Sequence, residues 1–190
     1  MKKILGLILA VILVTGISGI GAWAYFSDTE SSPNNQLTAG TLDLKTNDVD
    51  GVTQTLNAPN LKPNNSYGPS TIILRNSGSL AGATLDMAFS YVASDGSPNA
   101  VDMTADATAA VLEVTTLTYD GNSLLGSVFD NNSNGYKDIQ DVKNATLTGL
   151  AGLGAGASKN FVITIKMRDG ISNNFQADGV DITMTFTLKQ

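Results

Sequence analysis

A twelve-residue run, 130–141, holds the side chains whose types and spacing could do chemistry, and that chemistry would be calcium binding. Side-chain oxygens occupy the first, third, fifth, ninth and twelfth positions, and Gly135 is the sixth residue. These ligand positions are Asp130, Asn132, Asn134, Asp138 and Asp141. In EF-hand and dockerin-type loops the glycine makes a sharp turn, and the seventh carbonyl, here that of Tyr136, is a further ligand. The spacing therefore predicts a calcium loop.

Two departures from that pattern leave a second interpretation open. The twelfth residue is Asp141 where Glu is usual, and the eighth is Lys137 where an apolar residue is usual. Three carboxylates and two amides would give a dissociation constant on the order of 10⁻⁴ to 10⁻³ M, as in extracellular calcium modules. The alternative is a solvated loop without metal, because Asn and Asp are common in turns of every kind.

The chain contains no His and no Cys. Without His there is no His-dependent triad, no zinc-protease helix motif and no imidazole general base. The scattered carboxylates are not accompanied by a nucleophile elbow or a phosphate-binding glycine loop. We therefore expect no catalytic residues and no enzyme. The core, a metal or neighbouring subunits, rather than disulfides, must stabilise the fold.

Three asparagines, Asn64, Asn131 and Asn144, begin Asn-X-Ser/Thr sequons. They are candidate acceptors only in an organism that N-glycosylates exported proteins. Such sequons also arise by chance in an Asn-rich chain, and a glycan on Asn131 would compete with calcium for the same loop.

The first 24 residues have the features of an export signal. Lys2 and Lys3 precede an apolar or small-residue run over 4–21, and Ala22 and Ala24 flank Trp23 in a small-x-small cleavage site. A retained membrane anchor is the alternative, because the run approaches the roughly 20 apolar residues that cross a bilayer. We expect signal peptidase to cut between Ala24 and Tyr25. The product would have no stable membrane anchor and would be secreted, extracellular or attached to the cell surface.

The mature chain is acidic. Removal of Lys2 and Lys3 leaves nine basic residues against seventeen acidic ones, a net charge of −8. Such a surface repels nucleic acid and anionic lipid, so we expect no nucleic-acid partner. The remaining 166 residues are enough for one domain with a sizeable core.

The elements that must position these residues are predicted to be strands. Short runs rich in Thr, Val, Ile and aromatics are separated by turn residues, as in a sandwich or barrel. The predicted strands are residues 37–45, 52–56, 71–75, 83–92, 111–119, 161–167 and 180–188. The last two alternate between apolar and polar residues, which indicates a half-solvated antiparallel sheet. A short helix is predicted over 139–147, a further helical turn over 105–111 and a loop over 149–156.

Three segments of the chain resemble the TasA, camelysin and archaeal bundling-pilin family. They occur in the family's order and cover the first third of the chain, whereas 93–159 is peculiar to this sequence. The segments are Ala22-Trp23-Ala24-Tyr25-Phe26-Ser27-Asp28-Thr29-Glu30, then Leu37-Thr38-Ala39-Gly40-Thr41-Leu42-Asp43-Leu44, then Asn60-Leu61-Lys62-Pro63 with Asn76-Ser77-Gly78-Ser79-Leu80-Ala81.

The resemblance implies an all-β fold, a β-sandwich of jelly-roll type with one short helix in an insertion. It also implies a homopolymeric extracellular fibre joined by donor-strand complementation, in which an N-terminal segment completes a sheet of the next subunit. In this sequence the donor would be Tyr25 to Glu30, with Tyr25 and Phe26 as anchors. The alternative is that this segment folds back onto its own domain or frays.

The expected organisation is a signal peptide over 1–24, a donor strand and linker over 25–36, and a sandwich over 37–190 with a loop insertion at about 93–159. The expected function is that of a structural subunit of a filament or biofilm-matrix fibre. A monomeric, calcium-stabilised cell-surface binding or adhesion module is the alternative from a different class.

Overall fold

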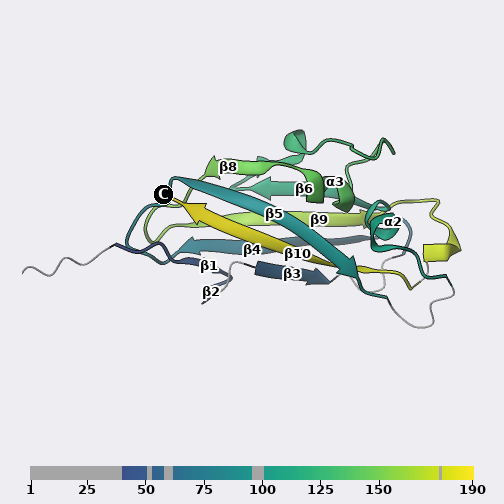
Figure 1. Cartoon of the computed structure of the whole chain (residues 1–190), viewed down its shortest axis with the longest axis horizontal. Coiled ribbons are helices and arrows are strands. Elements are labelled where there is room, and N and C mark those ends of the chain that lie inside the picture. The colour runs from purple at the N-terminus through teal and green to yellow at the C-terminus, as the bar shows by residue number, and fades with distance from the viewer. Residues whose placement is uncertain (1–39, 51–52, 58–61, 96–100, 176) are drawn as a thin grey trace, which may run out of the picture. The chain divides into compact units, whose positions relative to one another are not determined.

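The computed structural model describes residues 40–50, 53–57, 62–95, 101–175 and 177–190, with residues 53–57 described by their backbone alone. These residues form two antiparallel sheets, as Figure 1 shows. The six-stranded sheet has the order β2-β1-β4-β9-β6-β7, and the four-stranded sheet has the order β3-β10-β5-β8. The prediction of an all-β sandwich is therefore confirmed.

The strands of both sheets come from the whole length of the described chain. The larger sheet contains β1 (Leu44–Thr46), β2 (Val49–Asp50), β4 (Ser66–Asn76), β6 (Leu112–Tyr119), β7 (Asn122–Ser123) and β9 (Ser158–Met167). The smaller sheet contains β3 (Thr53–Asn57), β5 (Thr84–Ala93), β8 (Leu147–Ala151) and β10 (Val180–Lys189). Short helical turns connect them: α2 (Ala105–Ala109), η1 (Leu125–Ser127), α3 (Ile139–Asn144) and η2 (Asn173–Phe175).

The core lies between the sheets, and period-two alternation supplies it. From Phe161 to the end of β9, and on β10 as far as Phe186, every second side chain is buried, which confirms the alternation predicted from the sequence. Phe161 of β9 meets Phe186 of β10 edge to face, with ring centroids 5.5 Å apart. Each such side chain contributes about 1.5 to 3 kcal/mol through removal of its surface from water. The core therefore stabilises the domain without a disulfide.

Four element boundaries predicted from the sequence are wrong. One is the start of β4, which the sequence places at Thr71 and the structure at Ser66. Of the predicted strand 37–45, the described part is a strand only from Leu44, because residues 41–43 bond to a turn instead. The predicted loop 149–156 begins inside β8, which pairs with β5 through Leu150 and Leu85. Pairing with a long neighbouring strand outweighs the low strand propensity of Gly149. The helix predicted over 139–147 ends at Asn144, where β8 soon begins.

The predicted helical turn over 105–111 is α2, so the described residues include two short α-helices rather than one. Residues 93–159, expected as a loop insertion, contain β6, β7, β8 and both α-helices. Of these, β6 pairs with β9 along most of its length. This part of the chain therefore builds both sheets and also carries the predicted calcium loop.

Candidate functional site

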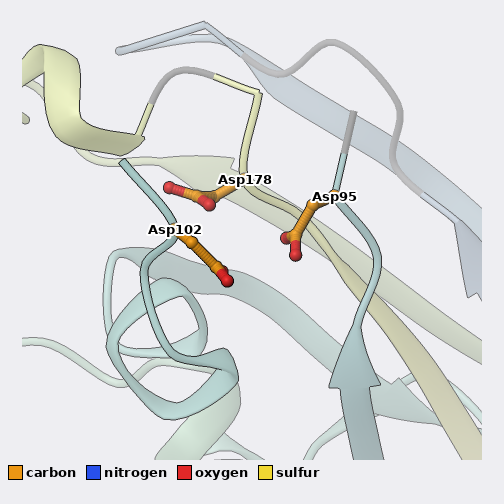
Figure 2. A group of neighbouring side chains, drawn as sticks. All are labelled: Asp95, Asp102 and Asp178. Atoms are coloured by element: carbon orange, nitrogen blue, oxygen red, sulfur yellow. The ribbon is translucent and has the colours of Figure 1, made fainter. Parts of the chain in front are cut away.

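Three carboxylates from separate parts of the chain meet at one end of the domain. Asp95 follows β5, Asp102 precedes α2 and Asp178 precedes β10, as Figure 2 shows. Their ligand oxygens all lie within 4.8 Å of one another. Asp95 and Asp102 are exposed and Asp178 is half-buried. The three carboxylates could hold a metal ion.

The backbone around this acidic triad holds two of its members in place. The amide of Met103 donates to Asp178 Oδ1 at 3.2 Å, and the amide of Gly179 donates to Asp95 Oδ1 at 3.5 Å. Carboxylate oxygens are the ligands preferred by hard cations such as Ca²⁺ and Mg²⁺. The donor set thus fits a hard cation.

No pattern in the sequence indicated this triad. Its members are separated by 7 and 76 positions in the printed numbering, and each belongs to a Gly-, Asn- or Asp-containing connection between elements. Only the antiparallel pairing of β5 with β10, which aligns Val180 with Ala93, brings Asp178 beside Asp95. The three carboxylates could therefore be grouped only from knowledge of which strands are neighbours, and not from their spacing in the sequence.

The predicted calcium loop is folded by hydrogen bonds to its own amides. Asp130 accepts from the amides of Asn134 at 3.1 Å and Gly135 at 2.8 Å. Asn134 Oδ1 accepts from the amide of Tyr136 at 2.9 Å. Gly135 has φ +85°, which a side chain would oppose, so the sixth position needs glycine.

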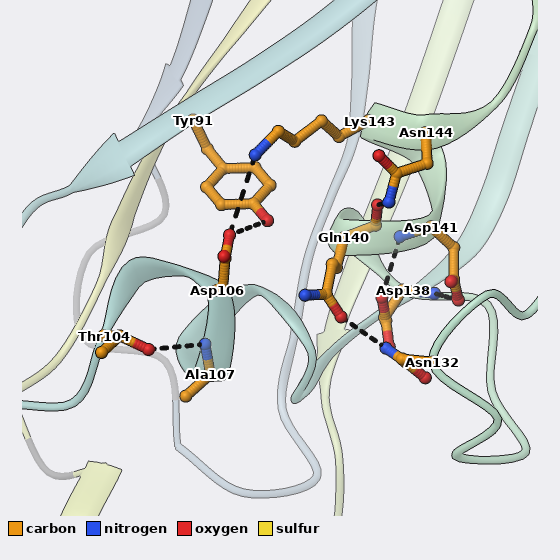
Figure 3. A network of polar contacts seen from close by, with 10 residues as sticks. All are labelled: Tyr91, Thr104, Asp106, Ala107, Asn132, Asp138, Gln140, Asp141, Lys143 and Asn144. Carbon is orange, nitrogen blue, oxygen red and sulfur yellow. Dashed lines mark hydrogen bonds and ion pairs between the residues drawn. The ribbon is translucent and has the colours of Figure 1, made fainter.

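The last two predicted ligands form the start of α3. Asp138 is the N-cap, accepting from the amide of Asp141 at 3.1 Å, and Asp141 accepts from the amide of Asp138 at 3.2 Å. This reciprocal pair is a capping box, which supplies acceptors for the free amides at the helix start. Figure 3 shows the pair beside Asn132, whose amide donates to Asp138 Oδ2 at 3.0 Å. The carboxylates thus have a structural role that the sequence pattern did not indicate.

Both capping carboxylates are fully buried, at 0% exposure. Burial raises the pKa of Asp138, against the opposing effect of hydrogen bonds from Asn132 and Asn134. Among the residues described, no lysine or arginine forms an ion pair with Asp130, Asp138 or Asp141. Lys137, at the eighth position, donates instead to the carbonyl of Leu125. A buried negative charge without a cation is unfavourable, so the loop would gain from a bound cation.

The loop and the triad differ in how closely their carboxylates approach. Within the described ranges, the three-carboxylate group compact enough to share an ion is the triad of Asp95, Asp102 and Asp178, and not the loop. In the loop the amide groups of Asn132 and Asn134 point their nitrogens at Asp138 Oδ2, at 3.0 and 2.7 Å. Calcium binding there would require both amides to turn their oxygens inward.

The candidate glycosylation acceptors are all exposed. Asn64 lies in the turn where the amide of Asn65 donates to Lys62 O, and it adopts φ +67°. Asn131 lies in the loop and Asn144 ends α3. The expected cleavage site Ala22 to Tyr25 and the donor segment 25–30 lie outside the described residues.

Two of the segments that carry the family resemblance lie against each other. The amide of Ser77 donates to Asp43 O at 2.7 Å, and the amide of Leu80 donates to Thr41 O at 3.0 Å. A Cβ on Gly78 would lie 2.2 Å from Thr41 O, so only glycine allows this approach. Asn76, fully buried, donates to the carbonyls of Leu80 and Leu153 and so holds the turn. We call this contact between residues 40–43 and 77–80 the join. It holds the first described residues of the domain in place.

The fold is an antiparallel sandwich, its connections hold carboxylate clusters, and the chain has no His or Cys. These features define a β-sandwich protein with candidate sites for a hard cation. The sequence model of the camelysin metallo-endopeptidase family matches residues 1–190, and the chain therefore belongs to this family, the TasA and camelysin group. A search of curated proteins finds no match to the chain. Members of the family are secreted or cell-associated. Within the described part of the chain, no helix is long and apolar enough to cross a membrane.

The family description implies a catalytic metal, which can be compared with the donors present. Catalytic zinc is held by His, Cys and carboxylate ligands, with His or Cys in each established set. This chain has neither His nor Cys. The acidic triad offers oxygen ligands alone, which suit calcium or magnesium rather than zinc. The residues therefore do not fit a zinc peptidase centre.

Proposed function

We propose that the mature protein is the structural subunit of an extracellular filament or biofilm-matrix fibre. The observation that carries the proposal is that the described residues alone build a continuous core, with members from Ile72 to Phe186. The described residues thus supply a core of their own, and in this proposal the segment 25–36 serves a neighbouring copy. Membership of the TasA and camelysin family supports the same role.

Polymerisation would proceed by donor-strand complementation. Residues 25–30 of one copy would add a strand to a sheet of the next, since an unpaired sheet edge offers amides and carbonyls for a new ladder. Tyr25 and Phe26 would be the anchors. Burial of each could contribute about 1.5 to 3 kcal/mol, before the cost of association is subtracted.

Export and assembly would be coupled by the same cleavage. The cut after Ala24 would release Tyr25 and Phe26 from the membrane-directed leader and make them available to another copy. Signal peptidase is thus the transient partner, and the protein itself is the lasting partner. Localisation is extracellular or at the cell surface.

Electron microscopy of two purified forms tests the proposal. The mature form, residues 25–190, should form fibres, and the form starting at residue 37 should stay monomeric. Fibres from the shorter form, or a mature form that remains monomeric at high concentration, would contradict donor-strand assembly.

The proposal makes the protein structural rather than a peptidase. The absence of His and Cys supports this view, because the usual general base and zinc ligands are missing. The mature protein should not degrade a labelled unfolded protein above the background of a buffer blank. Proteolysis that a chelator abolishes, and that persists after removal of contaminants by a second chromatography step, would overturn this assignment.

We also propose that calcium stabilises the domain. The observations in favour are the acidic triad and the buried carboxylates of Asp138 and Asp141, with which no described Lys or Arg forms an ion pair. The ligands in the loop would be Asp130, Asn132, Asn134, the Tyr136 carbonyl, Asp138 and Asp141. A calcium-stabilised surface-binding module that stays monomeric is the second candidate function, and the microscopy above separates it from the first.

Calcium titration of the melting temperature tests this stabilisation. For a dissociation constant of about 1 mM, 10 mM calcium should stabilise by about 1.4 kcal/mol, which corresponds to roughly 3 to 6 °C. Asp130→Asn should abolish the shift if the loop binds, and Asp102→Asn should abolish it if the triad binds. Asp169→Asn, an exposed carboxylate outside both sites, is the matched control. No shift in the unmodified protein would exclude calcium at both places.

A further inference from the structure

The open edges of the two sheets differ in how they are protected from pairing with another chain. Natural sheets block such pairing with charges, proline, bulges, very short strands or a covering loop. At one end of the larger sheet, β2 has two residues and carries the ion pairs Lys45–Asp50, at 2.9 Å, and Arg75–Asp48, at 3.3 Å. Beyond β1, the strand β4 contains Pro69 beside a register shift in its pairing with β9. This edge is protected.

The other end of the larger sheet is covered. Beyond the two residues of β7, the outer side of β6 bonds to the connection that follows it. The amide of Leu124 donates to Leu117 O, and the amide of Val114 donates to Lys137 O, at 2.8 and 2.7 Å. Asp138 forms an isolated bridge with Glu113. The calcium loop thus closes this edge.

In the smaller sheet, β8 is a poor edge for a ladder. Its pairing with β5 shifts register between Leu85 and Met87, and Gly149 has φ +69°. Its last carbonyl, that of Ala151, already accepts from the hydroxyl of Tyr119 at 2.7 Å. A bulged five-residue strand of this kind twists away from a straight partner.

The edge of β3 has none of these protections. Its five residues, Thr-Gln-Thr-Leu-Asn, include no charge, proline or glycine. They pair with β10 in unbroken register from Asp181–Asn57 to Thr185–Thr53. Among the residues that the structure describes, no strand pairs with its other side.

The direction of the β3 backbone follows from β10. Gly179 O accepts from the amide of Ser94, and Lys189 O accepts from the amide of Ala83, so odd-numbered residues of β10 face β5. Even-numbered ones therefore face β3, because successive residues of a strand point their amides and carbonyls to opposite sides. The partners of Ile182 and Met184 are Leu56 and Gln54. Consequently Thr53, Thr55 and Asn57 present their backbone groups outward.

We propose that the outer edge of β3 is the acceptor for residues 25–30 of a second copy of this chain. This assignment rests on the proposed function. The donor has six residues, one more than the five of β3. The linker after the donor, 31–36, can span about 20 Å at 3.3 to 3.6 Å per residue, so the donor can extend away from its own domain.

Charge also favours the β3 edge over the β2 edge of the larger sheet. The donor carries Asp28 and Glu30, and β3 has no charged residue to repel them. The edge at β2 carries Asp48 and Asp50, which would lie close to an acidic strand. Like charges placed directly opposite each other in a sheet are destabilising.

Proline substitution in the mature protein tests the acceptor. Thr55→Pro removes an outward amide and leaves the bonds to β10 intact, so the monomer should keep its circular dichroism spectrum and lose fibre yield at least tenfold. Asp50→Pro, at the β2 edge, is the control and should form fibres normally. If Thr55→Pro also forms fibres, the acceptor assignment is wrong while the proposed function stands. If the unmodified protein forms none, the proposed function fails and the assignment fails with it.

Disulfide mapping gives an independent measurement that does not depend on the stability of the proline variant. Because the chain has no Cys, single substitutions can be mixed: Ser27→Cys or Asp28→Cys as donor, and Thr53→Cys, Thr55→Cys or Asn57→Cys as acceptor. Oxidation of growing fibres should link donor and β3 acceptor into a dimer band. Fibres that crosslink only to Asp50→Cys or to Thr148→Cys, on β8, would overturn the proposal.

Discussion

At the scale of single residues, Tyr119 joins β6 to β8. Its ring is 4% exposed, and its hydroxyl donates to the carbonyl of Ala151 at 2.7 Å. Burial raises the pKa of Tyr119 to about 12, and the charge of Asp120 adds to the rise. The folded state therefore holds this proton more tightly than the unfolded chain, in which the pKa is about 10.

The pH dependence of Tyr119→Phe follows from that difference. The contribution of the tyrosine to stability is complete below pH 10 and is lost as pH rises through 12. At pH 8 the variant should be less stable by about 1 kcal/mol, the net value of one hydrogen bond. Between pH 10 and 12 the unmodified protein should lose about 2 to 3 kcal/mol relative to the variant. Urea denaturation of both proteins across this range is the measurement. If the stabilities of the two proteins change with pH in parallel, the raised pKa of Tyr119 is not the cause.

Substitution of the buried Asn76 should destabilise the domain more than Tyr119→Phe does at pH 8. Its side-chain amide donates to Leu80 O and Leu153 O, and its oxygen accepts from the amide of Gly78. Asn76→Ala leaves these buried groups without partners, so we expect a loss of about 3 kcal/mol in the free energy of unfolding. The exposed Asn122→Ala should change it by less than about 0.5 kcal/mol. Equal effects of the two substitutions in urea denaturation would show that Asn76 does not hold the turn.

At the scale of elements, a small network fixes both α-helices to β5. Tyr91 donates to Asp106 of α2 at 2.6 Å, and Lys143 of α3 lies 3.7 Å from the same carboxylate. The Lys143 Nζ also lies 4.4 Å from the centroid of the Tyr91 ring, in a cation–π contact. Figure 3 shows both side chains. Burial, then the bond to Asp106, raises the pKa of Tyr91.

A double-mutant cycle measures this contact. Lys143→Met combined with Tyr91→Leu should show a coupling energy of about 0.5 to 1 kcal/mol, since an exposed cation over an aromatic ring contributes that much. Lys143→Met combined with Tyr67→Leu, on β4 of the other sheet, should be additive. Thermal denaturation of the four proteins in each cycle is the measurement. Additivity in both cycles would show that the contact between Lys143 and Tyr91 does not stabilise the fold.

The elements that could be predicted are those in which local pattern and tertiary pairing agree. The strict alternation in β9 and β10 has one dominant interpretation, so both strands were found within three residues. The prediction was wrong at β8. Gly149 and Gly152 are typical of a loop, but β8 forms backbone pairs with the neighbouring strand β5. At the site, the spacing of 130–141 identified a real folded loop, yet it could not show that Asp138 and Asp141 cap α3. The triad depends on which strands are neighbours, which spacing does not encode.

At the scale of the whole molecule, the proposed assembly gives the described domain and the segment before it different roles. The domain has its own core, with members from Ile72 to Phe186, and the join between 40–43 and 77–80 fixes its first residues. Under the proposed assembly, the segment 25–36 can be removed and returned as a separate peptide.

A synthetic peptide of residues 25–36 should bind the domain that starts at residue 37. Binding to the folded state alone stabilises by RT ln(1 + [L]/Kd), about 2.7 kcal/mol at one hundred times Kd, which corresponds to roughly 5 to 10 °C in this size range. The same peptide with Tyr25→Ser and Phe26→Ser should lose most of this shift, because it lacks the apolar anchors. Added to the mature protein, the unmodified peptide should shorten fibres by occupying acceptor edges. A melting temperature that is unchanged at millimolar peptide would mean that the segment does not complete the sheet of another copy.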